Sequence, residues 1–157
     1  MIVVDNGGNR STHAAFNLCM KAYKPERDEI FLINVYTSWD YLNEEKNAGK
    51  LALSQYERLC QAENIPVTVR QIEADDPNEE LVDIITDLEI DTVYIGDMSF
   101  TNVANSDNIV FSFFSNVKRY FTGTTAEYLK EHVNSTTKII VATEHYIDKT
   151  VPFAFDN

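Results

Sequence analysis

The chain has 157 residues, of which 44% are hydrophobic, 24% charged and 11% aromatic. This length and composition are those of a single globular domain and exclude an intrinsically disordered chain. The 25 acidic residues outnumber the 13 lysines and arginines, so the formal net charge is −12. Such a charge repels phosphate backbones and anionic lipid headgroups, which disfavours nucleic-acid-binding and membrane-surface functions.

The N-terminal sequence and the number of cysteines indicate in which cellular compartment the protein is expected. The opening MIVVDNGG lacks the basic start of a signal peptide. No apolar run approaches the roughly 18 residues that a membrane-spanning helix needs. We therefore expect a cytoplasmic protein. Cys19 and Cys60 are too few for a disulfide framework and are expected to be small buried hydrophobic residues.

The first half of the chain predicts two strands, each followed by a helix. The run EIFLINVY is almost wholly apolar, which is typical of a strand buried on both faces of a parallel sheet. The second helix begins with NEEKNAG, a segment also compatible with a loop. The predicted elements are a strand at 2–4, a helix at about 12–23, a strand at 29–36 and a helix at about 41–64.

The second half continues the alternation. Asp76 can cap a helix, Pro77 suits its first position, and Glu79 falls three residues after the cap. Leucines and isoleucines then recur at spacings of three and four residues, as on a buried helix face. The predicted elements are a strand at 66–72, a helix after Asp76, a strand at 91–96, a helix at about 125–133 and a strand at 138–143.

Strands that alternate with helices predict an α/β fold, in which a parallel sheet carries helices on both faces. We expect one domain over residues 1–157. Residues 97–122 interrupt the alternation, since a loop of this length exceeds the usual ~12 to 15 residues. Its aromatic part, IVFSFFSNVKRYF, is expected to pack as an extra helix or lid. Residues 145–157 form a C-terminal tail.

The order of these segments resembles the universal stress protein family over about residues 1–144. The resemblance rests on IVVD, HAAFNLCMKAY, FLINVY, VTVRQIEADDP, DTVYIG and GTTAEYLKEHVNSTTKIIVAT. It implies an open, five-stranded parallel sheet in the order 3-2-1-4-5, a Rossmann-like three-layer sandwich. In such sheets ligands bind where the strand order reverses, here between the first and fourth strands.

The family's ATP-binding members carry Gly, two residues, Gly, nine residues, then Gly followed by Ser or Thr, after the fourth strand. Gly96 matches the first glycine, and Gly123 with Thr124 matches the last pair. Ser99 replaces the middle glycine, and about 14 extra residues separate it from Gly123. A Cβ at Ser99 hinders any close approach or positive φ at that position.

The resemblance also implies roles for individual residues. Asp5 and the backbone near Val35 would face the adenine or ribose, and Gly96 would let the chain approach the phosphates. Gly123, Thr124 and Thr125 would present amides at a helix N-terminus, where the helix dipole favours anions.

Two features of the sequence oppose a bound polyphosphate. Thr124 and Glu127 have the spacing of a capping box, which would already use some of those amides. Several acids are expected to surround the site, and their field repels phosphates unless Mg²⁺ is bound. Lys118 and Arg119 either compensate for this charge or lie on a solvated helix face. The acids are Asp5, Asp75, Asp76, Asp97 and Asp107.

The sequence shows no catalytic or metal-binding constellation. His13, His132 and His145 are scattered, and we expect them at the surface or at helix ends. No nucleophile elbow, Walker loop or paired-cysteine motif is present. Enzymatic activity beyond slow, incidental ATP hydrolysis is not expected.

Two functional hypotheses remain open. In the first, the protein binds ATP or a related nucleotide, with Mg²⁺, as a signal. In the second, it is a nucleotide-free interaction or scaffold protein that dimerises through its last strand, KIIVAT, with the tail covering or crossing that edge. A third interpretation, a small enzyme of the adenylyl-transferring type, lacks a supporting motif.

Overall fold

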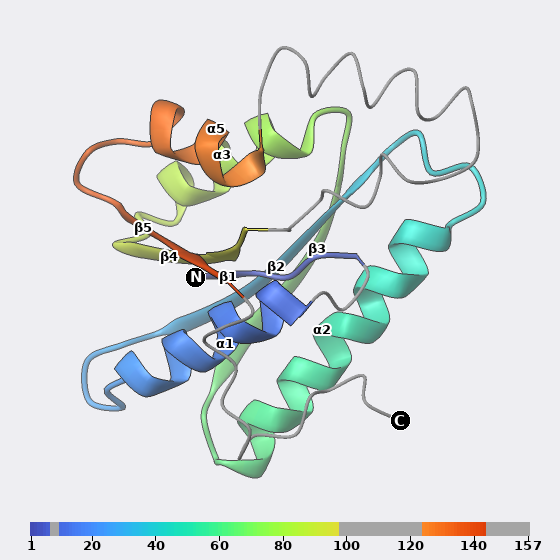
Figure 1. Ribbon diagram of the computed structural model, residues 1–157. Helices are drawn as coiled ribbons and strands as arrows, with labels where there is room; N and C mark the ends of the chain where they lie inside the picture. The colour runs from blue at the N-terminus through green and yellow to red at the C-terminus, as the bar shows by residue number, and fades with distance from the viewer. Residues whose placement is uncertain (7–9, 98–123, 144–157) are drawn as a thin grey trace.

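The computed structural model describes residues 1–6, 10–97 and 124–143. They form one five-stranded sheet in the order β3-β2-β1-β4-β5, with all neighbouring strands parallel. Figure 1 shows the sheet between two helical layers. The predicted fold class and strand order are therefore confirmed. The strands are β1 Ile2–Val3, β2 Ile30–Thr37, β3 Val67–Ala74, β4 Thr92–Gly96 and β5 Lys138–Ala142, and the helices are α1 Arg10–Ala22, α2 Glu44–Ala62, α3 Pro77–Asp87 and α5 Thr125–His132.

Each face of the sheet has its own hydrophobic core. Ile2 and Leu32 pack in the core under α1 and α2, whereas Val3 and Ile33 pack in the core under α3 and α5. This alternation follows from the two-residue period of a strand. The apolar run of β2 is thus buried on both faces, as predicted (Figure 1). No helix within the described residues is long and apolar enough to cross a membrane.

The predicted helix caps on the α3 and α5 side are confirmed. The Asp76 carboxylate accepts hydrogen bonds from the amides of Asn78, at 3.0 Å, and Glu79, at 3.5 Å. Thr124 and Glu127 form the complete capping box, with bonds of 3.2 and 2.9 Å in the two directions. These contacts fix where both helices begin.

The start of α2 differs from the loop that NEEKNAG allows. The helix begins at Glu44, and only Asn43 of that segment lies outside it. The cause is Asp40, whose two carboxylate oxygens accept from the amides of Glu44 and Lys46, each at 3.0 Å. A side chain outside the predicted segment therefore satisfies the first amides of the helix.

A polar network crosses the sheet at Asn34, which is fully buried in the mostly apolar strand β2. Its side-chain amide donates to the Val4 carbonyl at 2.9 Å and to the Asn6 side chain at 2.6 Å. Its oxygen accepts from Gln71 at 3.1 Å, and Gln71 also donates to the Lys46 carbonyl at 2.7 Å. The network therefore connects the carboxyl end of β1 to α2 across β2 and β3.

Gly49 lets α2 lie directly on this network. A Cβ at Gly49 would stand 2.7 Å from the Asn34 Cγ and 2.8 Å from its Nδ2. Both distances are shorter than real Cβ contacts, and Asn34 cannot move without losing its hydrogen bonds. The glycine is therefore needed for close approach, although glycine inside a helix ordinarily costs ~0.5–1 kcal/mol relative to alanine.

We predict that Gly49→Ala destabilises the protein, against its helix propensity, by about 1 kcal/mol or more, as overpacking does. In an Asn34→Ala background the obstacle is gone, and the same substitution should stabilise by about 0.5–1 kcal/mol. Urea unfolding of the four proteins measures both values. If Gly49→Ala has the same sign in both backgrounds, the proposed contact does not limit the helix position.

Candidate functional site

The strand order reverses between β1 and β4, at the position where α/β sheets bind ligands. The two strands are parallel, and Ile2 is paired with Tyr94. Counting on from this pair along both strands, Asp5 falls level with Asp97, one residue after Gly96. The structure thus brings together two residues that the resemblance assigns to a ligand, Asp5 and Gly96.

Asp5 is an almost completely buried carboxylate, with 2% of its surface exposed. Burial raises the pKa of Glu45 and of Tyr56, and the negative charge of Asp5 adds a smaller rise to each pKa. Both of those residues belong to α2. The electrostatic field of Asp5 therefore reaches side chains of α2.

Gly96, the last residue of β4, is buried against the first turn of α1. A Cβ at this position would contact the Ser11 hydroxyl and stand 2.6 Å from the Ser11 carbonyl carbon and 2.7 Å from the Thr12 nitrogen. These are mostly backbone atoms, which cannot move independently. The glycine thus has a structural role, close packing of strand on helix, whether or not a ligand approaches it.

The first turn of α1 was missed by the sequence analysis as part of this site. Ser11 and Thr12 are 1% and 0% exposed, and the turn contains no acidic residue. A helix N-terminus of this kind carries a partial positive charge. The available signal was the sequence Gly-Gly-Asn-Arg-Ser-Thr after β1, in which two glycines precede two hydroxyl residues of the next helix.

The N-terminus of α5 lies on the opposite face of the sheet from α1 (Figure 1). Its Thr124 amide is bound by the Glu127 carboxylate, and the Glu127 amide is bound by the Thr124 hydroxyl. Thr125 follows with 7% of its surface exposed. Two of the amides near this helix start are therefore already satisfied within the helix, as the spacing indicates.

Val35 contributes no side chain to this site. It is fully buried in the core under α3 and α5, and it pairs with Ile72 of β3. Any contact between Val35 and a ligand must therefore use backbone atoms, as the resemblance implies. Ser99 and Gly123 lie outside the described residues, as do Asp107, Lys118, Arg119, His145, the predicted insertion after Asp97 and the predicted tail.

The carboxyl end of the sheet is acidic. Asp5 follows β1, Asp97 follows β4, and Asp75 and Asp76 follow β3. One buried oxygen of Asp97, Oδ1, has no hydrogen-bond partner within the part of the chain that the structure describes. A buried oxygen of this kind is a suitable acceptor for water or a cation. The described residues contain no group of three or more histidine, cysteine or acidic side chains arranged to hold a metal ion.

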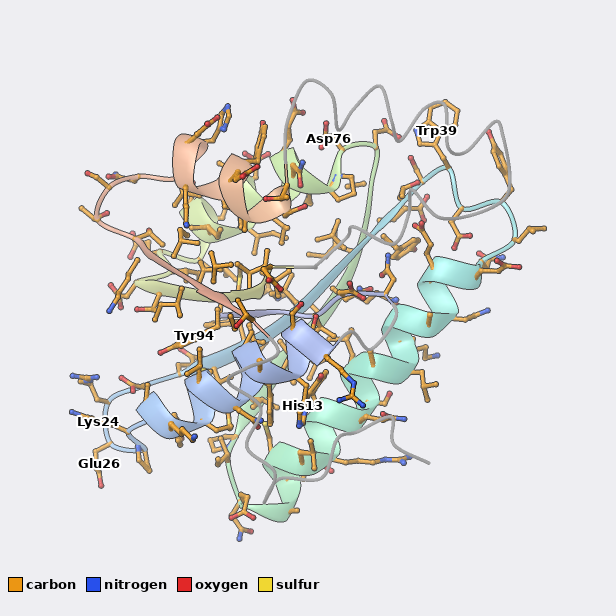
Figure 2. The ribbon with its side chains drawn as sticks, viewed as in Figure 1. His13, Lys24, Glu26, Trp39, Asp76 and Tyr94 are labelled. Carbon is orange, nitrogen blue, oxygen red and sulfur yellow. The ribbon has the colours of Figure 1, made fainter. Side chains whose placement is uncertain are left out.

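The histidine and cysteine predictions have different outcomes. His13 lies near the start of α1, one of the two kinds of position expected for it, but it is not a surface residue: it is 0% exposed, and Figure 2 shows it projecting from α1 toward α2. Its ring lies 6.0 Å from that of Tyr56 and 6.3 Å from that of Phe16, so aromatic packing accounts for its burial.

His132 lies at the end of α5 and is exposed, as expected. Cys19 and Cys60 are buried and free, and burial raises the pKa of each to about 11. Both therefore remain protonated thiols at neutral pH, which confirms them as packing residues.

Glu45, in the first turn of α2, is a carboxylate whose pKa responds to the charge of Asp5. Burial, followed by the charges of Asp40 and Asp5, raises its pKa, although the Thr37 amide donates a hydrogen bond that opposes the shift. A raised pKa in the folded state favours the protonated form. Its contribution to stability is therefore full below the pKa of an unfolded glutamate and is lost as the pH rises through the folded value.

We predict that Glu45→Gln stabilises the protein at pH 7, because the amide keeps an acceptor for Thr37 and removes a half-buried charge. The gain should disappear near pH 4, where a glutamate is largely protonated even in the unfolded chain. Urea unfolding at both pH values measures this difference. Glu44→Gln, at an exposed position one residue earlier, is the control, and equal gains from both variants would contradict the prediction.

Comparisons with known proteins identify relatives by structure only. No family model and no curated protein matches the sequence. A universal stress protein in complex with cAMP superposes with a TM-score of 0.59 at 14% identity, over 89% of this chain and 94% of that one.

Two further structures are similar to this chain. The hypothetical protein MJ0577, whose biochemical function was assigned from its structure, has a TM-score of 0.54 at 17% identity, over 90% of this chain and 93% of that one. The universal stress protein UspA from Lactobacillus plantarum has a TM-score of 0.54 at 16% identity, over 90% and 94%. The chain therefore has the fold of the universal stress proteins.

Proposed function

We propose that this protein binds ATP or a related nucleotide at the carboxyl ends of β1 and β4 and uses it as a signal in a universal-stress-type role in the cytoplasm. The observation that carries the proposal is the position of Gly96, which holds the end of β4 against the acid-free first turn of α1, beside Asp5. Its fold neighbour with bound cAMP supports a nucleotide as the ligand class.

In this proposal, different residues contact the base and the phosphates of the nucleotide. Asp5 and the backbone at Val35 bind the adenine or ribose. Gly96, Ser99, Gly123, Thr124 and Thr125 line the phosphate side, where the dipole at a helix N-terminus stabilises anions. The first turn of α1 adds a second such N-terminus.

Mg²⁺ completes the charge balance of this proposal. Asp5 on the base side and Asp97 after β4 place two negative charges at the carboxyl ends of the two strands that would hold the nucleotide. A bare polyphosphate is repelled there, whereas Mg²⁺ is bound by carboxylates and phosphate oxygens together. We therefore propose Mg-ATP rather than free ATP as the bound form, with no hydrolysis beyond a slow incidental rate.

We predict that Mg-ATP raises the melting temperature. At a concentration of 100 Kd it should add about 2.7 kcal/mol, or roughly 5–10 °C for a domain of this size. ATP with EDTA should have a much smaller effect. Asp5→Asn should lower the apparent affinity for Mg-ATP, as read from the melting-temperature shift, about tenfold.

The matched control is Asp91→Asn, which makes the same charge change on an exposed residue before β4, at the other end of the sheet. No shift with millimolar Mg-ATP would refute nucleotide binding. Tighter binding by Asp5→Asn would show that Asp5 only repels the phosphates and does not bind the ribose.

A second candidate function is that of a homodimeric interaction protein. The observation that favours it is β5, which forms one edge of the described sheet. Lys138 donates to Asp91 and Ala142 accepts from Asp97, so these two residues point their backbone groups toward β4. By alternation, Ile139 and Val141 point theirs outward, where a second copy would pair.

For this second function we predict that Val141→Pro converts a dimer into a folded monomer, because proline removes an outward donor and leaves the bonds to β4 intact. Ile140→Pro, which removes a bond to β4, should instead lower the melting temperature. Sedimentation equilibrium with circular dichroism separates the two effects. A Val141→Pro protein that stays dimeric would exclude β5 as the interface, and deletion of residues 150–157 tests the tail in the same way.

A further inference from the structure

The loop between β2 and α2 presents three large apolar side chains to solvent. Trp39, Tyr41 and Leu42 are 55%, 78% and 75% exposed. Among the described residues, only Leu51 is another exposed large hydrophobic residue, at 56%. Residues 38–43 are called the aromatic loop below. Exposed apolar side chains gathered in this way mark interaction sites.

Hydrogen bonds hold the aromatic loop in place. Ser38 donates from its amide to the Ala74 carbonyl at 3.0 Å, and its hydroxyl bonds the Asp75 carboxylate. The Trp39 amide donates to the Thr37 hydroxyl at 2.9 Å. Asp40 binds the first amides of α2 at the other end. The loop is thus tied to the end of β3 and to the helix start.

This arrangement exposes the apolar side chains without freeing the backbone. Asp40 points inward to the helix, and the residues on either side of it, Trp39 and Tyr41, meet edge to face with ring centroids 6.5 Å apart. Figure 2 shows Trp39 on the same side of the molecule as Asp76, on the loop that follows the neighbouring strand. A preorganised aromatic surface loses little conformational entropy when a partner binds.

The surroundings of the aromatic loop are acidic. Asp40 and Glu44 belong to the loop and the helix start, and Asp75 is bonded to Ser38. Glu73 accepts from the Tyr36 hydroxyl at 2.9 Å beside the end of β2. Among the described residues, the cation Lys46 lies 5.7 Å from the centre of the Tyr36 ring. The described residues around the loop therefore carry a net negative charge, as does the whole chain, whose formal net charge is −12.

This negative charge favours one of the two kinds of polypeptide that could cover the loop over the other. A second copy of the chain would bring two acidic surfaces together, and like charges across an interface cost several kcal/mol. A cationic segment would instead gain from the field while its apolar side chains bury Trp39, Tyr41 and Leu42. Tryptophan and tyrosine are the residues that most often contribute the binding energy of an interface.

We propose that the aromatic loop is a docking surface for a basic segment of another protein that carries large apolar side chains. The surface uses none of the residues assigned to the nucleotide. Its test is therefore independent of the proposed nucleotide binding.

Trp39 is the one tryptophan of the chain, so its fluorescence reports directly on the loop. The probe is a synthetic peptide of lysine and leucine in amphipathic spacing, without aromatic residues. We expect a saturable blue shift of the Trp39 emission with one peptide bound per chain. The same peptide with glutamate in place of lysine should give no shift.

Matched variants test whether the loop itself is the site. Tyr41→Ser combined with Leu42→Ser keeps Trp39 as the reporter and leaves the Asp40 cap intact, and it should weaken binding at least tenfold. Leu51→Ser, a comparable exposed residue on α2 outside the loop, should leave the affinity within a factor of two.

Three results would overturn the proposal. The first is an unchanged Trp39 spectrum at saturating peptide, and the second is equal affinity in the double variant. The third is concentration-dependent self-association that the double variant abolishes, which would show that a second copy covers the loop. Far-UV circular dichroism confirms that the variants are folded, so a loss of binding reports on the surface.

Discussion

The close contact between the end of β4 and the first turn of α1 determines the geometry of the candidate site. It is possible because Gly96 has no side chain where a Cβ would stand 2.6 Å from the Ser11 carbonyl carbon. The contact places an acid-free helix N-terminus at the point where the strand order reverses, next to the buried carboxylate of Asp5. The partial positive charge of this helix N-terminus and the carboxylate of Asp5 thus both lie at the carboxyl ends of β1 and β4.

A second constraint, the Asn34 network, keeps the carboxyl end of β1 in position. Through Asn34 the Val4 carbonyl and the Asn6 side chain are connected to Gln71, and through Gln71 to α2. Buried polar groups are costly unless each one is paired, so the network admits few alternative positions for the end of β1. The residues on either side of Asp5 are therefore fixed by contacts to the neighbouring strand.

The sequence predicted the fold well because the fold depends on patterns that neighbouring residues carry. The apolar run of β2, the Asp76 cap and the Thr124–Glu127 capping box are each readable within a few positions, and each is confirmed. The start of α2 was less certain from sequence, because Asp40 binds amides four and six residues later.

The contacts of the site were less predictable, because they join residues far apart in the chain. Gly96 meets Ser11, and Gly49 meets Asn34, only after the sheet has formed. His13 lies near a helix end, as one of the two expectations had it, but its burial was not predicted, since it depends on Tyr56 of another helix. Asn34 was visible as one polar residue in an apolar strand, but its partners could not be inferred from that position alone.

The central claim is that the protein binds a nucleotide at the carboxyl ends of β1 and β4, and equilibrium dialysis tests this claim most directly. Protein freed of small molecules by unfolding and refolding is dialysed against Mg-ATP, and the nucleotide on the protein side is identified by absorbance and mass. The account predicts saturation at one nucleotide per chain, with Asp91→Asn unchanged and Asp5→Asn weakened. An equal nucleotide concentration on both sides at millimolar Mg-ATP would contradict it.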